Sequence, residues 1–107
     1  VSSLLEEVSL LEEADIVDSI LLDTARSEKP GGTGCVHDWT LSRRILEETR
    51  LPLILAGGLK PENVREAIKA VSPYAVDTAS GVETCGKKDA VKIKSFIEEV
   101  RCANAFL

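Results

Sequence analysis

Apolar residues in this chain follow two patterns, short continuous runs and longer stretches with helical spacing. The clearest run is Leu-Ile-Leu-Ala at residues 53–56, inside a strand that we expect over residues 51–56. A continuous apolar run is typical of a strand buried on both faces, as in a parallel sheet. Two further runs predict strands over residues 16–22 and 74–78.

Apolar residues spaced three and four positions apart predict helices before, between and after these strands. One helix lies near the start of the chain, one covers about residues 39–50, and one covers residues 61–71. Asp89 is a typical N-cap for a last helix. The expected buried positions are, helix by helix, Leu4, Leu5, Val8, Leu10 and Leu11; Leu41, Ile45 and Leu46; Val64, Ala67, Ile68 and Val71; and Ala90, Ile93, Phe96, Ile97 and Val100.

The order of elements is a helix followed by strand and helix three times, with residues 84–88 expected as a loop. Such alternation with short connections predicts a parallel α/β sheet with right-handed crossovers. Ligands of parallel α/β proteins bind at the carboxyl ends of the strands. We therefore expect polar residues that follow the three strands to share one edge of the sheet.

Composition excludes several classes of protein. The chain has 107 residues, the size of one domain, and a net charge of −5 with scattered basic residues, which argues against a nucleic-acid surface. No apolar run approaches the roughly 20 residues needed to cross a bilayer. Three widely spaced cysteines with no Cys-x-x-Cys pair do not indicate zinc or a disulfide scaffold, and favour a cytoplasmic location.

Small residues follow two of the strands. Gly57 and Gly58 follow the central strand, and Ser80 and Gly81 follow the next one. In (β/α)8 barrels the loops after the last two strands often bind phosphate through backbone N–H groups. Glycines that only permit tight turns are the structural alternative, but two such clusters at adjacent strand ends favour a phosphate site.

Two aspartates lie at strand ends. Asp23 ends the first strand, where a carboxyl group is placed to act as a general acid. A helix-capping or loop-bracing aspartate is an equal alternative at this point. Asp77 offers the same choice, with the structural alternative slightly favoured because Thr78 and nearby N–H groups can satisfy its carboxylate.

The other candidates carry less information. Gly31-Gly32-Thr33-Gly34 lies in a ten-residue polar loop, residues 25–34, but lacks the ending and spacing of a P-loop. His37 is more typical of a surface or packing residue. Cys35, Cys85 and Cys102 do not end strands, so none is placed as a nucleophile or base.

Four segments resemble the C-terminal half of the phosphoribosylanthranilate isomerase family, over about residues 15–100. They are Leu21-Leu22-Asp23-Thr24; Gly31-Gly32-Thr33-Gly34 with His37-Asp38-Trp39; Leu55-Ala56-Gly57-Gly58-Leu59 with Pro61-Glu62-Asn63-Val64; and Val76-Asp77 with Ser80-Gly81-Val82-Glu83. The resemblance implies that residues 1–107 are a single partial (β/α)8-barrel domain, with strands six to eight of the barrel.

The resemblance also implies an activity in tryptophan biosynthesis. The family converts N-(5-phosphoribosyl)anthranilate to the carboxyphenylamino-deoxyribulose phosphate by an Amadori rearrangement, without metal or organic cofactor. Asp23 corresponds to the general acid. Gly57, Gly58, Ser80 and Gly81 correspond to the phosphate site, and Asp77 would lie near the sugar hydroxyls.

The sequence departs from the family pattern in three ways, one of which is His37, where the family commonly has an aromatic residue. Ala79 stands where the family usually has the first of two serines. The general base of the family is a cysteine in a Lys-Ile-Cys-Gly-like motif on the first strand, and no such motif is present. The chain also starts at Val1 and contains no Met. We therefore expect a piece of a full isomerase, inactive alone, that needs the N-terminal half-barrel or a second copy of itself.

Two alternatives remain at this point. Another phosphate-binding barrel enzyme, such as indole-glycerol-phosphate synthase, is disfavoured because no lysine at a strand end is placed to serve as its acid. A non-catalytic half-barrel that binds phosphate and acts in assembly is the alternative of a different class.

Overall fold

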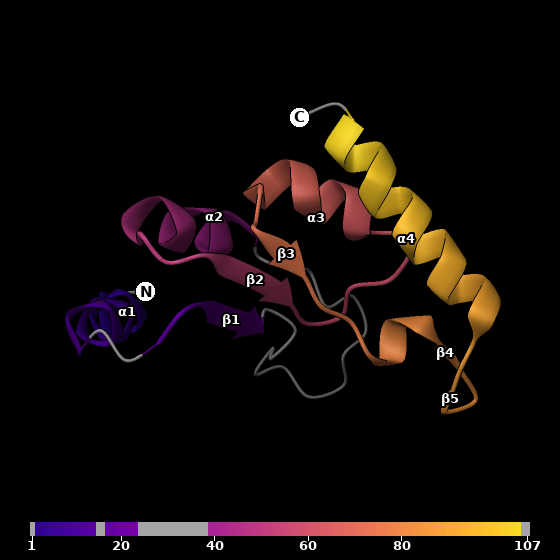
Figure 1. The fold of residues 1–107 in the computed structure, drawn as a ribbon, viewed down its shortest axis with the longest axis horizontal. Coiled ribbons are helices and arrows are strands. Elements are labelled where there is room, and N and C mark those ends of the chain that lie inside the picture. The colour runs from indigo at the N-terminus through magenta and orange to yellow at the C-terminus, as the bar shows by residue number, and fades with distance from the viewer. Residues whose placement is uncertain (1, 15–16, 24–38, 106–107) are drawn as a thin grey trace.

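The chain forms a small parallel sheet covered on one side by helices (Figure 1). A computed structural model describes residues 2–14, 17–23 and 39–105. The elements in chain order are α1 (Ser2–Ala14), β1 (Ile20–Asp23), α2 (Trp39–Glu48), β2 (Leu53–Ala56), α3 (Val64–Val71), β3 (Ala75–Val76), the 3-10 turn η1 (Ser80–Val82), β4 (Glu83–Thr84), β5 (Lys87–Lys88) and α4 (Ala90–Ala105). The predicted alternation of helix and strand is confirmed.

Strands β1, β2 and β3 are parallel and lie in the order in which they occur along the chain. Leu22 pairs with Leu55, which pairs with Val76 in the next strand. Asp23 pairs with Ala56. This register brings the carboxyl ends of all three strands to one edge, as the sequence predicts.

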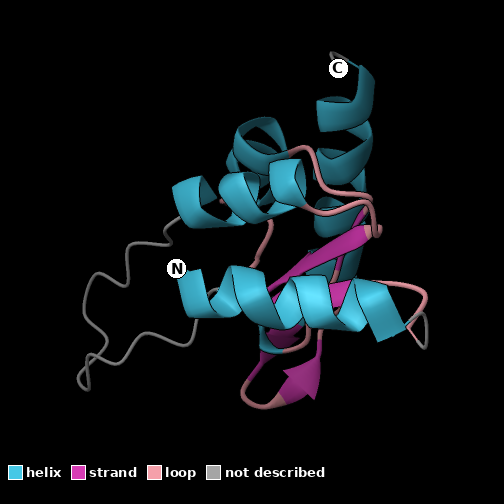
Figure 2. Cartoon of the chain, turned by 90° about the vertical axis from the view of Figure 1, so that its left-hand side faces the viewer, coloured by secondary structure: helices cyan, strands magenta, loops and turns pink. Residues whose placement is uncertain are grey.

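Helices α2, α3 and α4 lie in a row along one face of the sheet, whereas α1 lies near β1 and the end of α2 (Figures 1 and 2). The core between this row and the sheet contains Ile45 from α2, Leu53 and Leu55 from β2, and Val64 and Val71 from α3, all almost fully buried. These residues alternate along β2 and follow helical spacing along α3, so the apolar pattern itself determines which faces meet.

The other face of the sheet is open within the described residues. Leu21 is 55% exposed and Ile54 is only half-buried, although β2 was expected to be buried on both faces. The apolar run correctly predicted a parallel strand, but only one layer of helices covers it here. Leu21 lies on the edge strand β1 and pairs with Ile54 on β2, so the two form an apolar part of this face.

Several element boundaries differ from the sequence prediction. Residues 84–88 are not a plain loop, because β4 and β5 form an antiparallel hairpin there. Its turn holds Cys85 at φ 53° and Gly86 at φ 77°, the two left-handed positions that a tight hairpin turn requires. Strand β1 begins at Ile20, whereas a strand was predicted over residues 16–22.

The last helix also packs differently from the prediction. Phe96 and Ala103 are buried and Val100 is half-buried, whereas Ile93 and Ile97 are 37% and 45% exposed. The predicted cap is confirmed, because Asp89 Oδ1 accepts hydrogen bonds from the N–H groups of Val91 and Lys92. The Thr84 hydroxyl donates a hydrogen bond to Asp89 Oδ2. This bond, and to a smaller extent the bonds from the two N–H groups, lower the pKa of Asp89.

A carboxylate ties α1 to the loop between α2 and β2. Glu12 Oε1 accepts hydrogen bonds from the Thr49 hydroxyl and from the Arg50 N–H, the latter at 2.6 Å. The Thr49 hydroxyl first, and then the Arg50 N–H, lower the pKa of Glu12 from its ordinary value of 4.5. The first helix is thus held to the sheet through one side chain as well as through Val8 in the core.

No helix within the described ranges is long and apolar enough to cross a membrane.

The Glu12 tether, meaning the hydrogen bonds that Glu12 accepts from Thr49 and Arg50, should make the stability of the fold depend on pH. Because the folded-state pKa is lowered, the tether stabilises the fold above the unfolded pKa, and this stabilisation is lost as the pH falls through the folded pKa. We expect Glu12→Gln to lower the urea midpoint at pH 7 and to have a smaller effect near pH 3. Glu13→Gln removes the same charge from an exposed neighbour and is the control. An equal loss at both pH values for Glu12→Gln would contradict the tether.

Candidate functional site

A hollow of about 200 Å³ opens at the carboxyl edge of the sheet. It is lined by residues of β1, of the end of β2 and of the loops after β2 and β3: Leu21, Asp23, Ala56, Gly57, Gly58, Asp77, Thr78, Ala79 and Ser80. Five of the six predicted site residues are therefore brought together, although they are separated by more than fifty positions in the sequence. The sixth, Gly81, is not among the described residues that line the hollow. Residues 24–38, with the glycine-rich loop and His37, lie outside the described residues.

The loop after β2 turns sharply at its two glycines. Gly57 has φ 100° and Gly58 has φ 64°, conformations that glycine adopts without steric cost. Asn63 holds this loop from the far side, since its Nδ2 donates to the Gly58 carbonyl at 3.1 Å and its Oδ1 accepts from the Lys60 N–H at 2.9 Å. The helix was predicted from Pro61 but begins at Val64, so residues 61–63 form a turn that places Asn63 beside the loop.

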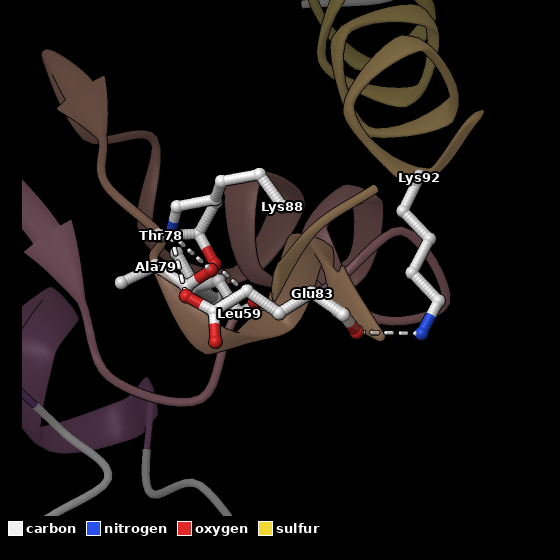
Figure 3. Close-up of polar contacts among 6 residues, drawn as sticks. All are labelled: Leu59, Thr78, Ala79, Glu83, Lys88 and Lys92. Carbon is white, nitrogen blue, oxygen red and sulfur yellow. Dashed lines mark hydrogen bonds and ion pairs between the residues drawn. The ribbon is translucent and has the colours of Figure 1, made fainter. Parts of the chain in front are cut away.

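The loops after β2 and β3 are joined by one carbonyl. The Thr78 hydroxyl donates to the Leu59 carbonyl at 2.6 Å (Figure 3). Gly81 lies against the same carbonyl, so closely that a Cβ added there would be 1.8 Å from the oxygen. Sequence reasoning assigned Gly81 to phosphate binding, whereas the structure shows a further reason for glycine, the close approach of two backbones.

Two carboxyl groups lie at the rim of the hollow. Asp23 is the last residue of β1, and Asp77 follows β3; both side chains are exposed. The Asp77 N–H donates to the Leu55 carbonyl at 2.9 Å, which continues the β2–β3 ladder by one residue and positions this side chain at the rim. The site thus combines acidic side chains with turns of small residues. This combination can donate a proton and bind an anion through backbone N–H groups.

A metal centre has no support in the described residues, where no group of three or more His, Cys, Asp and Glu side chains is placed to hold an ion.

Comparison with known proteins decides the family. The family model for N-(5'phosphoribosyl)anthranilate (PRA) isomerase matches residues 1–99. The chain belongs to this family. An isomerase from Methanosarcina acetivorans is 76% identical over all 107 residues, which are 45% of its own length. The chain therefore spans about half the length of the curated relatives it matches.

Solved structures of the family have the same fold. Phosphoribosyl anthranilate isomerase from Thermococcus kodakaraensis superposes with a TM-score of 0.71 at 45% identity, over 91% of this chain and 44% of that one. Another, solved in complex with reduced 1-(o-carboxyphenylamino)-1-deoxyribulose 5-phosphate, is 39% identical with a TM-score of 0.66, over 91% of this chain and 41% of that one. The predicted fold, parallel (β/α) units from part of a (β/α)8 barrel, is confirmed.

Sequence reasoning found five of the nine described residues that line the hollow but missed those that hold its loops. Asn63 was noted only as part of a family motif, and Thr78 only as a partner for Asp77. An asparagine shortly after a glycine pair is a recognisable signal, because its amide can bond to turn backbone. Nothing in the sequence pairs Thr78 with Leu59, because that contact joins the loops after two different strands.

Substitution of Gly81 should destabilise the isomerase-family fold. We expect Gly81→Ala to lower the free energy of unfolding by about 3 kcal/mol, because the added methyl group meets backbone atoms that cannot move freely. Urea unfolding followed by circular dichroism measures this loss.

Gly86→Ala is the control, because Gly86, unlike Gly81, has a positive φ, and nothing lies within 4 Å of an added Cβ there. This variant should lose only about 1 kcal/mol from the left-handed backbone. Equal losses at the two positions would show that the contact with Leu59 is unimportant.

Proposed function

We propose that this chain supplies the general acid and the phosphate site of a phosphoribosylanthranilate isomerase. The reaction is the Amadori rearrangement of N-(5-phosphoribosyl)anthranilate to 1-(o-carboxyphenylamino)-1-deoxyribulose 5-phosphate in tryptophan biosynthesis. The observation that carries this proposal is the hollow that gathers Asp23, the Gly57-Gly58 turn and Ser80 at one edge of the sheet. Membership of the family and a relative solved with the reduced product analogue support it.

In the proposed mechanism, Asp23 protonates the ring oxygen of the ribose, which opens the ring to a Schiff base. A base then removes the proton at C2′, and the resulting enolamine tautomerises to the ketone. Proton transfers of this kind are the task of side-chain acids and bases. Asp77, which follows β3 on the other side of β2 from Asp23, would contact the sugar hydroxyls.

The phosphate of the substrate would lie against the loops after β2 and β3. Gly57 and Gly58 let backbone approach the anion closely, and Ser80 adds a hydroxyl donor at the rim. Gly81 would complete this site with its N–H group while its missing Cβ keeps the two loops together. Backbone N–H groups in successive turns form a favourable seat for phosphate oxygens even in an acidic protein.

The general base would come from outside this sequence. No Lys-Ile-Cys-Gly-like segment is present, and the exposed Cys85 and Cys102 lie on the hairpin and on α4, away from the hollow. We propose that residues 1–107 form one partial barrel domain. The exposed Leu21 face of its sheet would be covered by the rest of a barrel, or by a second copy of the chain. The complete protein would be cytoplasmic.

A second candidate is a non-catalytic half-barrel that binds phosphate. The hollow is built entirely within this chain, whereas the base is not, which is the observation that favours it. The two candidates differ in whether added barrel sequence produces turnover.

Completion of the barrel should produce activity. We expect the 107-residue chain alone to show no isomerisation, measured by the loss of anthranilate-linked fluorescence. Fusion to the part of the Methanosarcina acetivorans relative that has no counterpart here should produce turnover and restore growth of an isomerase-deficient strain without tryptophan. The control is the same added part alone. Growth from the added part alone, or an inactive but folded fusion, would contradict the proposal.

Replacement of Asp23 tests the general acid in that fusion. We expect Asp23→Asn to lower kcat by about 10³-fold, in the range for loss of a positioned acid, with little change in folding. Asp18→Asn, an exposed aspartate that precedes β1 and does not line the hollow, is the matched control. Full activity of Asp23→Asn would assign the acid to another residue.

A further inference from the structure

A lysine outside the hollow donates a hydrogen bond to the loop that lines it. Lys88 Nζ donates to the Ala79 carbonyl at 3.0 Å and lies 2.6 Å from Glu83 Oε2 (Figure 3). Ala79 lines the hollow, whereas Lys88 is not among the described residues that do so. The ammonium group therefore contacts a residue that lines the hollow without lining the hollow itself.

The hairpin holds this ammonium in place. Lys88 on β5 pairs directly with Glu83 on β4, so the two side chains meet across the ladder. Lys92 of α4 donates to the Glu83 carbonyl at 2.8 Å, which ties the same strand to the last helix. An isolated surface ion pair contributes little, but here the hairpin register presets the geometry. The position of Lys88 relative to Ala79 is thus set by three elements.

Because the peptide group is planar, holding the Ala79 carbonyl also fixes the direction of the Ser80 N–H. The bond between Ala79 and Ser80 is trans, so the Ala79 carbonyl and the Ser80 N–H point in opposite directions from one rigid plane. The carbonyl is held by Lys88 at 3.0 Å and, at the longer distance of 3.4 Å, by the Val82 N–H, so the Ser80 N–H points away from Lys88. Among the described backbone hydrogen bonds outside helices and strands, none has this N–H as its donor.

We propose that Lys88 is a positioning residue for anion binding, which turns the Ser80 N–H into the hollow by holding the Ala79 carbonyl out of it. The inference rests on the proposed phosphate site. A carbonyl oxygen directed at a phosphate would repel it, whereas an N–H group in the same place binds it. Lys88 thereby selects the productive orientation of one peptide without touching the ligand.

The test is a titration of the 107-residue chain with inorganic phosphate, followed through the amide resonances of Gly58 and Ser80. The native chain should show saturable shifts of both amides. We expect Lys88→Met to weaken phosphate binding about tenfold, with the largest change at Ser80. Lys88→Arg keeps donors to both acceptors and should restore most of the affinity.

Lys92→Met is the matched control. It removes a lysine hydrogen bond to the same hairpin but leaves the Ala79 carbonyl held, so it should lower the thermal midpoint without changing phosphate affinity. If Lys88→Met does not fold, Glu83→Gln takes its place and should weaken binding about threefold, because the ammonium loses the carboxylate that orients it. Unchanged affinity in that folded variant would overturn the proposal.

The outcomes separate the two proposals. Absence of saturable shifts in the native chain would overturn the phosphate site, and the role of Lys88 with it. Native binding with unchanged affinity in folded Lys88→Met would overturn only the role of Lys88. An equal loss of affinity in Lys92→Met would show that both lysines act through general stability, which also overturns it.

Discussion

The geometry of the hollow depends on contacts made to one group, the Leu59 carbonyl. It accepts the Thr78 hydroxyl at 2.6 Å and lies against Gly81, where no side chain has room. Parallel pairing brings strand ends to one edge, but it does not determine how the loops beyond that edge sit. A single carbonyl, shared by the loops after β2 and β3, sets their separation.

Residues that do not line the hollow hold its wall in place. Asn63 bonds to the Gly58 loop from the start of α3, and Lys88 bonds to Ala79 from the hairpin. Binding is stronger when the binding groups are already positioned, since less conformational freedom is lost with the ligand.

The proposed anion site is compatible with an acidic chain because its donors would be local. The net charge of −5 is spread over the surface, where solvent and salt screen it within about 10 Å. Backbone N–H groups at a turn act over a few ångströms and need no basic patch. The likeness to isomerases of known structure and the open Leu21 face of the sheet agree with a barrel of which this chain is about half.

The sequence by itself determined the alternation of the four α-helices with the three parallel strands, and five of the residues around the hollow, but not the β4–β5 hairpin. These features follow from local spacing: apolar runs for strands, helical repeats such as Val64 to Val71, and small or acidic residues at strand ends. Tertiary structure alone decided the exposure of Ile93, Ile97 and Leu21. It also decided the hydrogen bonds from Thr78 to the Leu59 carbonyl and from Lys88 to the Ala79 carbonyl. The reason is physical, because those features depend on which neighbour covers a face and on contacts between separate loops and strands, and neither is encoded in the spacing of nearby residues.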